Sequence, residues 1–188
     1  IYTLLFKNHG QAAGASLEHS HCQLISMPVM PARVKEELEG AKRYFASHGR
    51  CVFCDIIRQE RREEIRVVAE DESLIVIAPY ASRSPFEMWI LPRNHGTHFE
   101  RAAPEILQAL ARTLRVLLTK IDRALEKPAY NFLLHNGGMK DTEMPHYHWH
   151  LEIIPRLVRL AGFEWGTNVC INPTTPEDAA KVLREFPL

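Results

Sequence analysis

The sequence predicts an α+β fold in which an antiparallel sheet packs against helices, with one complete unit and the end of a preceding duplicate. Three observations support this prediction: short apolar strands separated by turn residues, amphipathic helical stretches, and a repeated pattern of strand, Asn/Gly turn and His-x-His strand. With 188 residues, 46% of them apolar and 24% charged, the chain can bury one substantial core or two modest ones.

The first 50 residues should contribute two strands and one helix. Residues 1–6 are rich in β-branched and aromatic side chains and predict a strand that is already under way where the sequence begins. A turn at residues 8–10 and a loop of small residues follow, and the apolar run 24–27 predicts a second strand that pairs with the first. Apolar residues spaced for one buried stripe predict an amphipathic helix over 32–46, which Gly49 ends.

A second unit is expected to open at Cys51. Strands bounded by turn residues are predicted at 66–69, 74–78, 86–91, 130–134 and 147–154. Leucine and isoleucine recur at three- and four-residue intervals from about Pro104 to Glu126, which is typical of one long helix packed on a sheet. A shorter helix is predicted from about Pro176 to Glu185.

An internal repeat links the two parts of the chain. Residues 4–10 and residues 132–138 each form an apolar strand that ends in Asn and Gly, and a His-x-His strand follows each of them. The two later strands are His19-Ser20-His21-Cys22-Gln23 and His148-Trp149-His150-Leu151-Glu152, so that Gln23 and Glu152 fall in register. Chance similarity of two half-buried strands is the alternative, but the number of matching positions favours duplication.

We therefore predict two units, with the C-terminal portion of the first over residues 1–50 and a complete second unit over residues 51–188. Cys51 lies so far before His148 that its counterpart in the first copy would precede residue 1. The sequence is accordingly expected to be the C-terminal part of a longer protein.

A metal site is predicted in the second unit. Cys51 and Cys54 are spaced to hold one Zn²⁺ from a tight turn, and His95 and His148 are the expected third and fourth ligands. A closed site of two cysteines and two histidines would be structural, because no position is left for water or substrate. A thioredoxin-type redox pair is the alternative for the cysteines, although the strand-turn-helix context for it is poor. The competing histidine ligands are His98, His135 and His146.

A nucleophile is predicted in the first copy. Alternation along a strand places His19 and His21 on the same face, so one ring can be held by a metal or hydrogen bond while the other presents a free nitrogen to phosphorus. The Gln23 amide can donate to a phosphoryl oxygen as charge develops. Hydrogen-bonded core histidines are the alternative. Attack by His21 would split the displacement into two steps and give ping-pong kinetics.

The composition limits the partners. Lys plus Arg balance Asp plus Glu at 23 each, so we expect a small charged substrate and neither nucleic acid nor membrane as a partner. The apolar runs are too short to span a bilayer, and the four cysteines do not form a disulfide framework. A cytoplasmic location is predicted.

Several motifs along the chain are typical of one protein family. They are Phe6-Lys7-Asn8-His9-Gly10, Gly14, Ser16, His19-Ser20-His21-Cys22-Gln23, Cys51-Val52-Phe53-Cys54-Asp55, Pro85-Phe86-Glu87-Met88-Trp89-Ile90-Leu91-Pro92, His148-Trp149-His150-Leu151-Glu152-Ile153-Ile154-Pro155-Arg156 and Ala161-Gly162-Phe163-Glu164-Trp165-Gly166-Thr167. With these motifs the sequence resembles the galactose-1-phosphate uridylyltransferase family of the histidine-triad superfamily, including its short microbial members and the related plant nucleotide-sugar phosphorylase. The resemblance covers nearly the whole chain.

This resemblance implies a two-step exchange. UDP-glucose would uridylylate His21 and release glucose 1-phosphate, and galactose 1-phosphate would then attack the intermediate. By matched position, Asn8, Ser16 and Gln23 would contact the nucleotide phosphates. Phe163 and Glu164 would hold the hexose across a homodimer interface.

The resemblance also implies metal ligands. His19 would be a zinc ligand of the first unit, and the second unit's site would correspond to Cys51, Cys54, His95 and His148. Other members use a Glu and three histidines instead, for which the matching positions are Glu37, His135, His148 and His150. The cysteine pair favours the zinc version.

Departures from the family leave alternative functions open. Ser20 stands where the family usually has Pro between the two histidines, and Cys22 stands where it has Gly or Ser. A nucleotide-sugar phosphorylase using ADP-glucose or a similar donor, and a non-catalytic zinc-stabilised dimerisation or binding fragment, are the main alternatives. A histidine-triad hydrolase with His148 as nucleophile would conflict with the zinc assignment.

Overall fold

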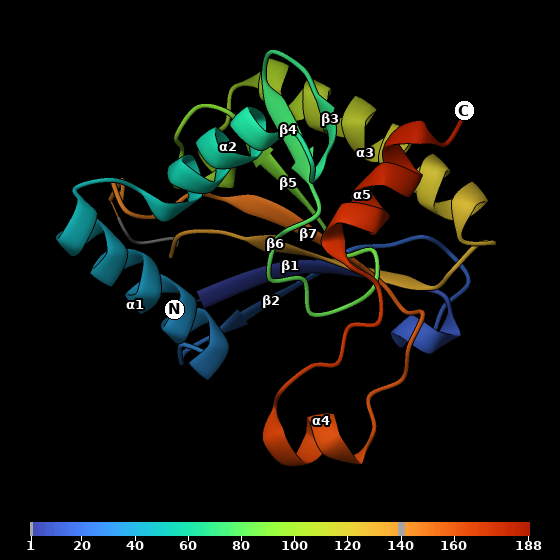
Figure 1. Ribbon diagram of the computed structural model, residues 1–188. Coiled ribbons are helices and arrows are strands. Elements are labelled where there is room, and N and C mark those ends of the chain that lie inside the picture. Colours follow the sequence, from blue (N-terminus) through green and yellow to red (C-terminus); the bar gives the residue numbers. More distant parts are fainter. Residues whose placement is uncertain (1, 139–141) are drawn as a thin grey trace.

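Seven strands form one antiparallel sheet in the computed structural model, which describes residues 2–138 and 142–188 (Figure 1). The strand order across the sheet is β2-β1-β6-β7-β5-β4-β3. The strands are β1 (Tyr2–His9), β2 (Gln23–Met27), β3 (Val67–Glu70), β4 (Leu74–Ile77), β5 (Met88–Pro92), β6 (Tyr130–His135) and β7 (His150–Pro155). The predicted α+β class is confirmed.

Helices cover both faces of the sheet. They are α1 (Ala32–His48), α2 (Val52–Glu63), α3 (Pro104–Ala124), α4 (Gly162–Thr167) and α5 (Pro176–Glu185), with single 3-10 turns at Gln11–Ala13 and Phe99–Arg101. Helices α3 and α5 pack on one face through residues such as Leu117, Ile121 and Leu183. Helices α1 and α2 pack on the other face at one end of the sheet through Ala41 and Phe53. Much of the second face therefore stays open.

The structure differs from the sequence prediction in several places. His19 and His21 are expected on a strand, but they precede β2, which begins at Gln23. Helix α2 replaces the expected tight turn at the cysteine pair, and its apolar side is narrow because Arg and Glu dominate its second half. The strand expected over 86–91 begins at Met88, since Phe86 has a positive φ of 59°. The strand expected over 147–154 begins at His150, and Trp149 bonds instead to the carbonyl of Gly96.

Strands β1 and β6 pair with each other about a local twofold axis. Phe6 lies opposite Gln23 on β2, and Leu133 lies opposite Glu152 on β7, so Phe6 and Leu133 are equivalent positions of the repeat. These two residues are also paired directly with each other. The ladder thus makes His135 the counterpart of Asn8, whereas the sequence repeat alone pairs Asn8 with Asn136.

The first 50 residues share their sheet with the second unit, because β1 joins β6 edge to edge. The boundary between 1–50 and 51–188 stays a prediction. None of the helices in the described ranges is both long and apolar enough to cross a bilayer.

Candidate active site and metal centre

The four predicted zinc ligands converge at one end of the sheet. Cys51 caps α2, Cys54 lies in its first turn, His95 follows β5 and His148 precedes β7. Their ligand atoms all lie within 4.8 Å of one another. Cys54 Sγ is 3.4 Å from His95 Nδ1 and 3.6 Å from His148 Nδ1. Two tetrahedral bonds of about 2.3 Å to sulfur and 2.0 Å to nitrogen give a separation of about 3.5 Å, so the spacing fits zinc.

The second nitrogen of each imidazole is held by the backbone. His148 Nε2 donates to the carbonyl of Pro92 at 2.9 Å, and His95 Nε2 donates to that of Met144 at 3.2 Å. Each ring is therefore protonated on Nε2 and directs the lone pair of Nδ1 toward the sulfur atoms. A metal ion bound through Nδ1 requires this tautomer. The hydrogen bond from Cys54 lowers the pKa of Cys51 to about 4, and the same contact raises the pKa of Cys54.

A second group that could hold a metal contains Glu37, His135 and His150. The alternative set of one Glu and three histidines is therefore not brought together, because His148 joins the cysteines. His135 bonds to carboxylates through both ring nitrogens, at 2.8 Å to Glu37 and 3.1 Å to Glu152. In this arrangement the ring bridges two acids and leaves no free lone pair for an ion.

These groups form a continuous chain of polar contacts on the open face. Arg83 bonds to Glu152, and Tyr147 donates to Glu37 at 2.7 Å. Burial acts to raise the pKa of Glu37, but hydrogen bonds from His135 and Tyr147 and the electrostatic effect of the nearby histidines together act more strongly. The pKa of Glu37 is therefore lowered to about 2. Burial lowers the pKa of His150 to about 3, so this ring is neutral.

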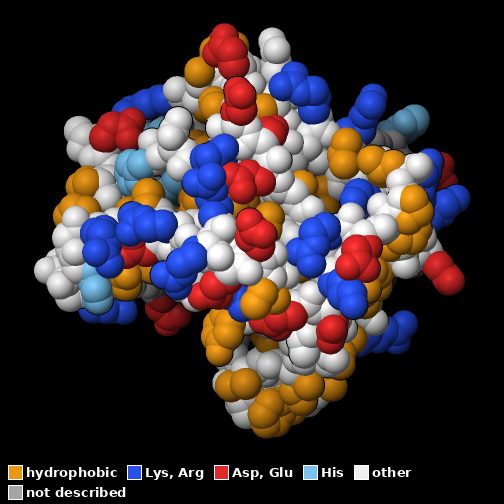
Figure 2. All heavy atoms as spheres, turned by 45° about the horizontal axis from the view of Figure 1, so that its top comes forward, with side chains coloured by type: hydrophobic (Ala, Val, Ile, Leu, Met, Phe, Trp, Pro, Cys, Tyr) orange, Lys and Arg blue, Asp and Glu red, His pale blue; other side chains and the backbone are white. Residues whose placement is uncertain are grey.

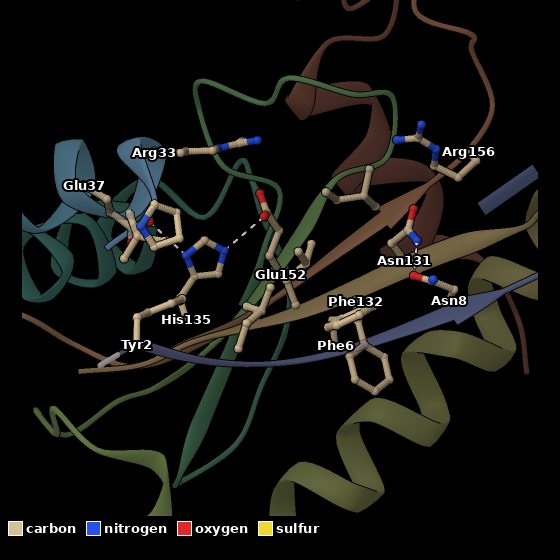
Figure 3. Close-up of a pocket in the computed structure, with 15 residues that line it drawn as sticks. Tyr2, Phe6, Asn8, Arg33, Glu37, Asn131, Phe132, His135, Glu152 and Arg156 are labelled. Carbon is tan, nitrogen blue, oxygen red and sulfur yellow. Dashed lines mark hydrogen bonds and ion pairs between the residues drawn. The ribbon is translucent and has the colours of Figure 1, made fainter. Parts of the chain in front are cut away.

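Beside this chain lies a cavity of about 330 Å³ on the open face of β1, β6 and β7. Figure 3 shows the Glu37, His135 and Glu152 chain at one end of the cavity and Asn8, Asn131 and Arg156 at the other. Arg33 of α1 also lines it. The sequence motifs did not indicate that Arg33, Arg83, Asn131 or Arg156 belongs to this site.

The two His-x-His motifs share one local geometry but differ in exposure. His21 Nδ1 contacts the carbonyl of His19 at 2.8 Å, and His150 Nδ1 contacts that of His148 at 3.1 Å. A donating Nδ1–H leaves the lone pair on Nε2. His21 is partly exposed, whereas His150 is 1% exposed and stacks on His135 with centroids 4.4 Å apart. Only His21 can present Nε2 to a ligand in solution.

The loop before His21 forms a groove lined by Asn8 and Ser16, two of the three expected phosphate contacts, and by His19, the expected zinc ligand of the first unit. Asn131 orients the Asn8 amide by donating to its Oδ1 at 2.8 Å, and it also donates to the carbonyl of Ala13 at 2.9 Å. The Asn8 amide nitrogen then faces the loop, 3.9 Å from the position a Cβ would take at Gly14. His21 and Gln23 do not line this groove.

Neither the two metal-binding groups nor the cavity includes three further residues of the predicted site, which are His19, Phe163 and Glu164. His19 is exposed and belongs to neither of the metal-binding groups found among the described residues. Phe163 and Glu164 lie on α4, which projects from the body of the molecule (Figure 1). Phe163 is 52% exposed, and Glu164 accepts a hydrogen bond from the backbone of Ala161.

Comparison with known protein families finds a match over most of the chain. A family model described as galactose-1-phosphate uridyl transferase, C-terminal domain, matches residues 37–187. The chain is 41% identical to ADP-glucose phosphorylase of Arabidopsis thaliana, covering 100% of this chain and 52% of that protein. It is 29% identical to galactose-1-phosphate uridylyltransferase of Thermotoga maritima, covering 98% and 60%. The chain thus spans little more than half the length of these relatives.

Solved structures agree with the sequence relatives. The crystal structure of the ADP-glucose phosphorylase from Arabidopsis thaliana with bound ADP-glucose has a TM-score of 0.92 at 40% identity, covering 100% of this chain and 60% of that one. A structure of uridylyltransferase has a TM-score of 0.90 at 29% identity, covering 97% and 59%. A histidine-triad-like protein from Bartonella henselae, at 22% identity and a TM-score of 0.52 over 73% of this chain, shares the fold.

The buried carboxyl of Glu87 should make stability depend on pH. Glu87 is 1% exposed, and burial raises its pKa from 4.5 to about 7. Because the pKa of Glu87 is higher in the folded state than in the unfolded state, its protonated carboxyl favours folding at low pH. This contribution to stability is lost as the pH rises through about 7. Glu87→Gln lacks this ionisation. Its free energy of unfolding should therefore rise relative to that of wild type by about 1 to 3 kcal/mol as the pH is raised from about 5 to about 8.5.

Chemical denaturation at the two pH values measures this gain. Exposed Glu72→Gln is the matched control and should show the same pH dependence as wild type. Equal pH dependence of wild type and Glu87→Gln would contradict the prediction.

Proposed function

Because the chain belongs to the galactose-1-phosphate uridylyltransferase family, we propose that it acts in nucleotidyl transfer through a covalent intermediate on His21. The observation that supports this assignment is the orientation of the His21 ring. Its Nδ1 is occupied by the carbonyl of His19, and its Nε2 is left as an accessible nucleophile next to a groove that holds Asn8 and Ser16. His150 has the same tautomer but is enclosed by protein.

The first step balances as a displacement at phosphorus. His21 Nε2 attacks the α-phosphorus of a nucleotide sugar, a phosphorus–nitrogen bond forms, and the bond from that phosphorus to the bridging oxygen breaks. The bridging oxygen leaves as part of hexose 1-phosphate. The second step reverses the chemistry with an acceptor phosphate oxygen as nucleophile, which regenerates the free ring. Donors from Asn8, Ser16 and Gln23 would stabilise the charge that develops on the phosphoryl oxygens.

The first candidate activity is exchange of a uridylyl group between UDP-glucose and galactose 1-phosphate, as in the uridylyltransferase relatives. The second is a nucleotide-sugar phosphorylase that uses ADP-glucose or a similar donor with inorganic phosphate. The second candidate is favoured by the 41% identity to the Arabidopsis protein, against 29% to the Thermotoga protein. Both share the covalent step on His21 and differ in base and acceptor.

We propose zinc as the ion at Cys51, Cys54, His95 and His148. The sulfur–nitrogen distances and the backbone-held tautomers support it. With four protein ligands the ion would have no open position, so it would hold the start of α2 against the start of β7 and would not touch substrate. His19 is proposed as a zinc ligand of the first unit.

A homodimer and a cytoplasmic location complete the proposal. Figure 2 shows hydrophobic side chains gathered on the projecting part of the molecule. This segment exposes Leu157, Val158, Leu160, Phe163, Trp165, Val169 and Ile171, an apolar surface that a second copy could cover. Phe163 and Glu164 would then contribute to the hexose site of the partner. All four cysteines are free, which fits a reducing compartment.

Labelling the intact protein with UDP-glucose that carries radioactive α-phosphate tests the nucleophile. Wild type should retain acid-labile label on His21, and His21→Ala should lose at least about 99% of it, because the covalent step is removed. His48→Ala, an exposed histidine at the end of α1, should label like wild type. Label that persists in His21→Ala but disappears in His150→Ala would assign the nucleophile to the second copy.

The acceptor separates the two candidate activities. The uridylyl intermediate of an exchange enzyme should be discharged by galactose 1-phosphate and not by inorganic phosphate. A phosphorylase should be discharged by inorganic phosphate and should label better from ADP-glucose than from UDP-glucose. Measuring loss of label with each acceptor, and labelling from each donor, decides between them.

Metal analysis tests the zinc proposal. The protein should carry at least about one zinc per chain, and Cys54→Ser should lose about one zinc and several kcal/mol of stability, because the closed site would be broken. Cys170→Ser changes an exposed cysteine and should keep the metal. Less than about half a zinc per chain in wild type, or unchanged stability in chelator, would contradict the proposal.

A further inference from the structure

The cavity between α1 and the open sheet face has an apolar floor and a basic rim. Leu4, Phe6, Leu133 and Ile154 line it from three neighbouring strands, and alternation places these side chains on one face. Its volume of about 330 Å³ falls within the range of small-molecule sites. Because Phe6 and Leu133 mark the local twofold axis, the cavity lies between the two His-x-His strands and is distinct from the loop groove, with Asn8 common to both.

Every carboxylate oxygen at this cavity already has a partner within the protein. Glu37 Oε1 accepts from Tyr147 and Oε2 contacts His135. Glu152 Oε1 accepts from Arg83 and Oε2 contacts His135. The acids of the cavity are therefore committed to the polar chain and do not neutralise further cations.

The two arginines at the rim, Arg33 and Arg156, make no hydrogen bond or ion pair through their guanidinium groups within the described ranges. Arg156 is half-buried, whereas Arg33 is exposed and acts on Glu87 only as a nearby positive charge. Leaving the half-buried Arg156 guanidinium unpaired is unfavourable, and phosphate is the group whose geometry matches its fork of donors. The exposed Arg33 adds a second positive charge at the rim. An apolar floor beneath two such donors suits a flat ring attached to a phosphate.

From this arrangement we propose that the cavity is a second ligand site, which binds a nucleoside monophosphate without reacting with it. The base lies on the floor formed by Phe6 and Leu133, and the phosphate meets Arg33 and Arg156. Among the described residues that line the cavity, the one histidine is His135, and two carboxylates hold its ring nitrogens, so it is not free to attack the ligand. The inference goes beyond the proposed function and rests on its assignment of covalent chemistry to the separate groove at His21.

Calorimetric titration of UMP and AMP into the intact His21→Ala protein tests the site. Arg33→Ala and Arg156→Ala should each weaken nucleotide binding at the cavity about tenfold, because each removes a charge-assisted contact to phosphate. Leu133→Trp should abolish nucleotide binding at the cavity because the larger side chain fills the space above the floor, and Leu133→Ile should keep it. Lys35→Ala, which removes an exposed cation from the same helix, is the matched control and should bind like the parent.

Three results would overturn the proposal. One is unchanged nucleotide binding in both arginine variants and in Leu133→Trp, with circular dichroism confirming that each is folded. Another is inorganic phosphate binding as tightly as UMP, which would show that the floor recognises no base. The third is loss of His21 labelling in the arginine variants with His21 intact, which would make the cavity part of the donor site. If wild type is not labelled on His21 but still binds nucleotide in a way that depends on the two arginines, the proposed function fails and the cavity proposal stands.

Discussion

The pairing of β1 with β6 is the contact on which the rest of the site depends. Phe6 opposite Leu133 joins the two copies of the repeat into one sheet and sets which residues of each strand face α1. A slip of one residue would turn Asn8 and the floor of the cavity toward α3, because side chains alternate between the faces of a sheet. The same pairing brings Asn131 to Asn8, so the orientation of a predicted phosphate-binding amide is fixed by the opposite copy.

Equivalent strands have diverged in what surrounds them. In the second copy, α1 and α2 cover the His-x-His strand, and Glu37, Phe53 and Trp89 close around His150. In the first copy, β2 is an edge strand among the described residues, and His21 is partly exposed. One backbone motif therefore gives a buried neutral ring that supports the fold and an accessible ring suited to chemistry.

Much of this arrangement was predictable from sequence because it depends on local pattern. The strands, the long helix α3 and the repeat follow from periodicity, and the Cys51, Cys54, His95 and His148 group follows from ligand type and spacing. Helix α2 was missed because its apolar stripe rests mainly on Phe53 and Ile57 in a strongly charged segment. The contacts of Arg83 with Glu152 and of Asn131 with Asn8 join residues 69 and 123 positions apart, and no local pattern encodes such pairs.

The separation of His148 from His150 shows how one His-x-His motif can serve two separate groups of side chains. Adjacent histidines of a His-x-His motif serve different centres: His148 turns its Nδ1 to the cysteines, while His150 joins Glu37 and His135. Applied to the first copy, the same division would give His19 the metal-binding role proposed for it and His21 the proposed role of reacting ring. The carbonyl of His19 contacts His21 Nδ1 and so orients that ring. Under the proposed function, one accessible ring of this kind would form one covalent intermediate per turnover, so donor and acceptor would react in succession.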